Sequence, residues 1–340
     1  MRRWLPCIWV AFLVSVPLWM RNQYYLHILI STGIFAVAAM SLNLLLGYTG
    51  QLSLGHVAFF GIGAYTSALV SLGFDLQLSE GYTFVFEPRP VWLGFLCGVA
   101  AAGFFGWIIG RLSFRVRGAY FVIVTVSFAE VVKLVALNWV DLTEGPMALN
   151  NIPPVTLSFP GLGELTFWKK EPNYYLVLAV CLLSYLVIRR LVFSRAGRAF
   201  IALRENEALA ESVGVDVTRF LVLAAVVSAA IAGAAGGLYA HYIKIVDPDI
   251  FLFIYTVTMV IMVVAGGKGT LLGPVVGAVI FGILPEALRE AARPEVQWII
   301  YGLFMILIVF FLPDGIVPAV SGRLRPRLSP ARGDTAEEAA

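Results

Sequence analysis

Long apolar runs, separated by short polar or charged segments, make up most of this 340-residue chain. Nine of them approach the roughly 20 apolar residues that an α-helix needs to cross a bilayer. A tenth is shorter and is interrupted by prolines. The ten runs cover residues 4–20, 24–46, 54–72, 91–112, 118–139, 174–193, 220–242, 250–266, 271–288 and 296–313. This pattern predicts about ten transmembrane helices.

The composition supports a membrane protein. Apolar residues make up 60% of the chain and charged residues 13%, whereas soluble domains are roughly 45–50% apolar and about 25% charged. We therefore expect an all-α polytopic membrane protein in which residues 1–321 form one transmembrane domain. Residues 322–340 are rich in Arg and Pro and then in Ala and Glu, which is typical of a disordered tail.

The distribution of Lys and Arg predicts the orientation, because these residues gather in cytoplasmic loops. If every run crosses once from a cytoplasmic N-terminus, sixteen of the 24 Lys and Arg residues are cytoplasmic. Both termini and the segment 194–219 then lie in the cytoplasm, and the loops 73–90 and 140–173 lie outside. The first run begins with basic residues, like a secretory signal, but it lacks a small-residue cleavage site. We expect an uncleaved first helix.

Two segments, 41–65 and 263–288, place polar residues and glycines within apolar runs. Non-helical backbone at membrane depth needs protein or a water-filled path beside it, and paired breaks of this kind indicate the translocation path of a transporter. We expect broken or re-entrant helices here, with tight helix packing as the alternative. The path candidates are Asn43, Gly47, Gln51 and His56 in the first segment, and Gly266 and Gly267 in the second.

Glu130 and Lys133 are ionisable residues inside an apolar run, three positions apart and therefore on one helical face. Charge within a membrane span usually serves a function, but an opposite charge nearby can simply fix the orientation of the helix. We expect an ion pair with a structural role. The alternative is a relay with His56 in an ion-coupled secondary transporter.

The segment 194–219 carries eight charged residues in a chain that is otherwise poor in charge. It predicts two short helices, one over 197–204 and one that begins after an Asn206 cap and ends at Gly214. The second helix has several acids, no base and a face of small residues. This combination favours docking to another protein over binding to lipid headgroups.

Catalytic and metal-binding patterns are scarce. The three histidines, His27, His56 and His241, do not have the spacing of metal ligands. The run 265–270 (AGGKGT) fails as a phosphate-binding loop, because Met262 replaces its first glycine and Gly269 replaces the required Ser or Thr. We expect no enzymatic activity, no metal and no cofactor in this chain.

Four stretches together resemble the LivM-type permease subunits of branched-chain amino acid importers, which belong to the ATP-binding-cassette (ABC) class. The resemblance covers roughly residues 30–315 and is carried by residues 41–65, 117–139, 197–216 and 263–284. It implies a multi-pass protein of the bacterial inner membrane. Its implied partners are a LivH-like second permease, two cytoplasmic ATPases that use ATP and Mg, and a periplasmic or extracellular solute-binding protein; no nucleic acid is implied. The implied solute is a branched-chain amino acid, with urea or short amides as alternatives.

The resemblance also assigns a role to the charged segment, which is similar to the EAA loop that couples importer permeases to their ATPases. Glu207, Ala208 and Gly214 match the core of that loop, with the glycine one place later than usual. Leu209 stands where many importers have a second alanine. The remaining candidates for contact with the ATPase are Arg204, Glu205 and Glu211.

Overall fold

The structure is a computed structural model, and it describes residues 13–17, 22–79, 82–114, 118–159, 163–289 and 294–324. A helix lies over each predicted span from the second to the tenth. The first span lies outside the described residues except for 13–17, which are helical. The helices over the spans are α2 (Gln23–Asn43), α3 (Val57–Leu72), α4 (Val91–Ser113), α5 (Ala119–Asn138), α7 (Lys170–Val192), α10 (Val217–Ile243), α11 (Phe253–Gly266), α12 (Gly273–Arg289) and α13 (Pro294–Phe311).

Not all of these helices are long enough to cross a bilayer on their own. Within the described residues, five have both the length and the apolar composition to do so: α2 with its extension to Thr49, α4, α5, α7 and α10. Helices α3 and α11 have 16 and 14 residues, so at 1.5 Å per residue they reach roughly 20–24 Å of a core about 30 Å thick. The short helices adjoin the glycine-rich breaks, which explains why they are short.

Helix α10 is the centre of the bundle and packs against α2, α3 and α4. Its small residues permit this close packing, as membrane helices require. A Cβ atom at Gly236 would overlap the carbonyl oxygen of Phe60 on α3, and one at Gly63 would overlap the carbonyl oxygen of Gly233. Backbone therefore lies directly against backbone along this contact.

Both predicted breaks are present. Helix α2 continues as a π-helix, η1 (Leu44–Thr49), which Gly50 ends in the left-handed conformation with φ +75°. Residues 50–56 have no regular helix, and α3 follows. The second break is confined to residues 267–272, between α11 and α12. Helix α12 starts at this break and runs through Pro285, so the run 271–288 is helical along most of its length.

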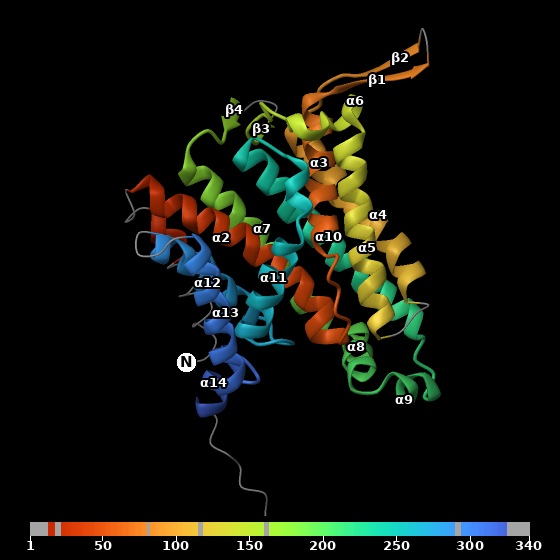
Figure 1. Cartoon of the computed structure of the whole chain (residues 1–340), viewed down its shortest axis with the longest axis vertical. Helices are drawn as coiled ribbons and strands as arrows, with labels where there is room; N and C mark the ends of the chain where they lie inside the picture. Colours follow the sequence, from red (N-terminus) through yellow and green to blue (C-terminus); the bar gives the residue numbers. More distant parts are fainter. Residues whose placement is uncertain are drawn as a thin grey trace, which may run out of the picture.

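The two ends of the bundle differ (Figure 1). One end carries two antiparallel hairpins, β1 (Phe74–Ser79) with β2 (Tyr82–Phe86), and β3 (Thr156–Phe159) with β4 (Gly163–Thr166). The short helix α6 (Val140–Thr143) is also near this end, with η2 (Gly145–Met147) in contact with it, and η3 (Pro248–Phe251) packs against α3 and α5. The opposite end carries α8 (Arg195–Glu205), α9 (Glu207–Ser212) and α14 (Ile316–Leu324).

This placement bears on two sequence-based expectations. The described residues are mostly helical, as the all-α class requires, and the short strands are confined to the loops expected to be external, 73–90 and 140–173, which form hairpins. The two loops do lie at the same end, away from 194–219, as the predicted topology requires. Of the predicted tail, residues 322–324 belong to α14 and the rest lies outside the described residues.

Candidate functional site

The charged segment 194–219 folds into two short helices because each has a cap of its own. The Ser194 hydroxyl accepts a hydrogen bond from the Ala196 amide at 3.1 Å and starts α8. The Asn206 side chain accepts one from the Leu209 amide at 3.0 Å and starts α9. Gly214 follows α9 with φ +89°, a backbone conformation that favours glycine. The predicted cap and end of the second helix are confirmed.

Helix α9 presents apolar side chains to the surroundings. Leu209 and Val213, one turn apart, are 62% and 73% exposed. Ala208 is also exposed, whereas Ala210 packs inward against Leu203 and Leu221. The small-residue face expected from the sequence is therefore better described as an apolar surface of Ala208, Leu209 and Val213. Among the other coupling-loop candidates, Glu205 and Glu211 are exposed and Glu207 is half-buried.

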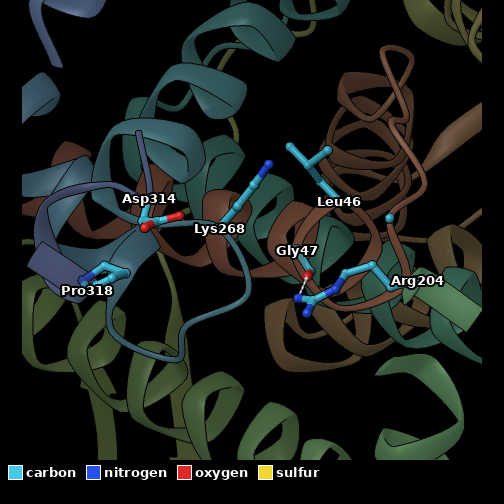
Figure 2. Close-up of a pocket in the computed structure, with 7 residues that line it drawn as sticks. Leu46, Gly47, Arg204, Lys268, Asp314 and Pro318 are labelled. Carbon is cyan, nitrogen blue, oxygen red and sulfur yellow. Dashed lines mark hydrogen bonds between the residues drawn. The ribbon is translucent and has the colours of Figure 1, made fainter. Parts of the chain in front are cut away.

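Arg204, at the end of α8, points toward the membrane helices rather than outward. Its Nη1 donates a hydrogen bond to the carbonyl oxygen of Gly47 at 2.9 Å (Figure 2). Its Nη2 lies 2.7 Å from the Glu205 carboxylate. The carbonyl of Gly47 in the π-helix η1 faces α8 and accepts this hydrogen bond from Arg204. Arg204 thus joins the charged segment to the first broken helix.

Asn43 joins the two broken segments to each other. Its Oδ1 accepts a hydrogen bond from the Gly269 amide at 2.9 Å, and its Nδ2 donates one to the Thr270 carbonyl at 2.8 Å. Gly47 lies against the same loop so closely that a Cβ there would overlap the Gly269 amide. We call Asn43, Gly47, Arg204, Gly269 and Thr270 the junction. It connects α8, η1 and the loop 267–272.

A cavity of about 500 Å³ lies beside the junction (Figure 2). It brings the exposed, oppositely charged Lys268 and Asp314 together with the junction. Sequence reasoning did not single out Asp314, although the Pro-Asp-Gly run 313–315 is typical of a turn. The cavity is lined by Leu46, Gly47, Gly50, Arg204, Lys268, Asp314 and Pro318.

The structure assembles four of the six path candidates and separates the others. Asn43 and Gly47 belong to the junction, and Gly266 and Gly267 lead into its loop. His56 is completely buried elsewhere, with Nε2 2.7 Å from the Ser41 hydroxyl. The Ser41 carbonyl in turn accepts a hydrogen bond from Ser228 of α10, so His56 takes part in helix packing. Gln51 is half-buried within the break itself.

Glu130 and Lys133 do not form the expected ion pair. Both lie on α5, but the structure has no salt bridge between them; Glu130 is exposed and Lys133 is half-buried. As for metal binding, no three His, Cys, Asp or Glu side chains lie close enough to hold an ion in the part of the chain that the structure describes.

A bundle of apolar helices with two glycine-rich breaks and a charged helix pair at one end has the features of a membrane transport permease. The chain belongs to the family described as the permease component of branched-chain amino acid transport systems, whose model matches residues 24–309.

The chain is similar to several named permeases, three of which follow. The chain is 31% identical to the high-affinity branched-chain amino acid transport system permease protein LivM of Escherichia coli K12, over 96% of this chain and 78% of that protein. It is 28% identical to LivH of the same strain, over 83% and 91%. It is also 28% identical to the fructose import permease protein FrcC of Rhizobium meliloti, over 77% of each. No solved structure matches the chain.

Proposed function

We propose that this chain is a permease subunit of an ATP-driven importer of branched-chain amino acids. The family match and the two LivM and LivH relatives support this assignment. The fructose permease among the relatives indicates that this type of chain also serves other solutes. The solute is therefore the part of the proposal that needs the most direct test, with urea and short amides as competitors.

The proposed assembly contains a second, LivH-like permease, two cytoplasmic ATPases that use ATP and Mg, and an external solute-binding protein. In this arrangement α8 and α9 face the cytoplasm and the two hairpins face the binding protein. The protein would then be a multi-pass component of the bacterial inner membrane.

The observation that carries the proposal is that residues 204–213 offer an exposed apolar surface and also bind the first broken helix. The exposed apolar side chains Leu209 and Val213 offer a surface to a protein outside the bundle. Arg204 precedes these two residues by five and nine positions and donates a hydrogen bond to the carbonyl oxygen of Gly47 at 2.9 Å. A displacement of α9 by a docked ATPase would therefore act on η1 and, through Asn43, on the loop 267–272. Both broken segments would move with the ATPase.

Reconstitution in proteoliposomes tests this function. The purified complex of all subunits, loaded with the binding protein, is expected to take up radiolabelled leucine in the presence of ATP, with unlabelled isoleucine and valine competing and urea, acetamide and fructose not competing. Competition by urea, acetamide or fructose, with none by isoleucine and valine, would reassign the substrate. Uptake by this chain without ATPases would contradict the importer class.

Substitutions separate docking from transmission. Leu209→Glu together with Val213→Glu is expected to reduce co-purification of the ATPases. Arg204→Ala is expected to leave the complex assembled but to lower ATP-driven uptake about tenfold, since a hydrogen bond to a charged group contributes about 1.5–3 kcal/mol. Arg198→Ala is the matched control, because Arg198 is an exposed arginine on the same helix. Equal uptake by the Arg204 and Arg198 variants would exclude Arg204 from transmission.

A further inference from the structure

Helix α5 has an exposed face that runs along its whole length. Only 22% of its span is buried, against 72% for α10. The exposed positions recur every three or four residues and therefore form one stripe on the helix. We call this the α5 stripe; its members are Tyr120, Ile123, Ser127, Glu130, Val131, Leu134, Val135 and Asn138. Helix α5 lies beside α4 in the bundle (Figure 1), and the exposure of the stripe residues means that the stripe faces away from the rest of the described chain.

The α5 stripe differs in composition from the exposed faces of the other long helices. Away from the helix ends, those faces are apolar, as contact with lipid requires. On α4 the exposed residues before the last turn are Trp92, Leu96, Ala100, Phe104, Phe105 and Trp107. On α7 they are Tyr175, Ala179, Leu183, Leu186 and Val187. On α13 the described exposed side chains include Ile299, Leu303, Ile306, Leu307 and Phe310. The α5 stripe instead has Ser127 and Glu130 at its centre.

Glu130 is too far from both ends of α5 to reach water along the helix. It lies eight residues from Asn138 and farther from Ala119, so the nearer end is about 12 Å away, beyond the reach of a glutamate side chain. Among the described residues, no hydrogen bond or salt bridge to the Glu130 carboxylate is formed. An acidic group at the centre of a lipid-facing helix costs at least about 2.5–3.5 kcal/mol. The stripe is thus a poor surface for lipid.

We propose that the α5 stripe is the contact surface for the second permease subunit, and that Glu130 meets a cationic or hydrogen-bond-donating group of that subunit. This inference rests on the proposed function for the existence of the second subunit. A different permease is favoured over a second copy of this chain, because E. coli K12 has two distinct relatives of this chain, LivM and LivH, that are both named as permeases of the branched-chain amino acid transport system. A second copy would also have to bring its own carboxylate to the contact if α5 faced α5.

Site-specific photocrosslinking tests the location of this contact. A benzoyl-phenylalanine residue is placed at Ile123, Ser127 or Leu134 on the α5 stripe, in the assembled complex in native membranes. The matched controls are Leu303 and Ile306, which are exposed on the apolar face of α13. We expect a crosslinked product with the second permease from the α5 positions and several-fold less from the α13 positions. Products with a second copy of this chain, or with no protein at all, would overturn the proposal.

Charge substitution tests the role of Glu130. Glu130→Lys is expected to reduce co-purification of the second permease about tenfold or more, since an unmatched charge at a buried contact costs 2–5 kcal/mol. Glu130→Gln keeps hydrogen-bonding capacity and should retain more of the partner than Glu130→Lys. Size-exclusion chromatography of the isolated chain controls for folding. Equal co-purification by wild type and Glu130→Lys would overturn the role assigned to this residue.

These results are separable from the proposed function. Crosslinking from the α5 stripe to a second permease in a complex that does not transport leucine would leave the contact established and remove the proposed solute. Leucine transport by a complex that gives no such crosslink would support the proposed solute and remove the proposed contact.

Discussion

Asn43 is the residue on which the link between the two broken segments depends. Replacement by Leu, which has a similar size, removes both hydrogen bonds to the loop 267–272 and leaves the Gly269 amide and the Thr270 carbonyl without their partner. A fully buried group left without its partner costs about 1–3 kcal/mol, and these two groups are half-buried, so that range is the upper limit for each. We expect faster hydrogen exchange across residues 267–272, measured by mass spectrometry. Asn138→Leu is the control, because Asn138 bonds only to the nearby Leu134 carbonyl, and equal exchange in both variants would contradict the role of Asn43.

The absence of a side chain at Gly236 allows α10 to approach α3 closely. A methyl group there would overlap the Phe60 carbonyl oxygen, so Gly236→Ala must push the two helices apart. Overpacking of this kind costs about 1–3 kcal/mol, and we expect a lower thermal unfolding temperature in detergent. Gly302→Ala on α13 meets no atom within 4 Å and gains helix propensity of up to about 1 kcal/mol. Gly236→Ala should therefore lower the unfolding temperature, whereas Gly302→Ala should raise it or leave it unchanged. A similar decrease in both variants would refute the packing argument.

Helix α9 depends on its cap. With only six residues it cannot be stable by propensity alone, so the hydrogen bond from the Leu209 amide to Asn206 contributes much of its order. Asn206→Ala is expected to destabilise α9 by about 1 kcal/mol and Asn206→Asp to preserve it. Hydrogen exchange of residues 207–212 measures the effect. ATP-driven uptake should fall in the same order, and an Ala variant with full uptake would separate the order of α9 from coupling.

The helices of this fold were largely predictable because their determinants are local. Apolar runs predicted the nine helices that lie over the spans, and Asn206 and Gly214 predicted α9. The hairpins were missed because their strands are short and lie in loops that look merely polar. The junction was not predictable, since its contacts join residues 157 and 227 positions apart in the sequence. The glycines at residues 47 and 266–267 indicated a close approach of backbone segments, but not which segments would meet.

The hairpins and α9 mark opposite ends of the bundle. If the bundle spans a bilayer in the orientation predicted by its Lys and Arg residues, the two ends lie in different compartments. We expect a cysteine at Val85 on β2, a side chain that is 60% exposed, to react with a membrane-impermeant maleimide in intact spheroplasts. A cysteine at Val213, directly after α9, should react only after permeabilisation.

The parent for both variants lacks Cys7, Cys97 and Cys181, so that labelling reports the introduced thiol alone. The predicted topology has an odd number of membrane crossings between β2 and α9. Labelling of both positions from outside would contradict it, because it requires an even number. The inverted result, with Val213 labelled from outside and Val85 protected, would place α9 away from any cytoplasmic ATPase. Only the expected pattern is compatible with energy from ATP reaching Gly47 through Arg204, because the donor of that hydrogen bond belongs to the same end of the molecule as α9.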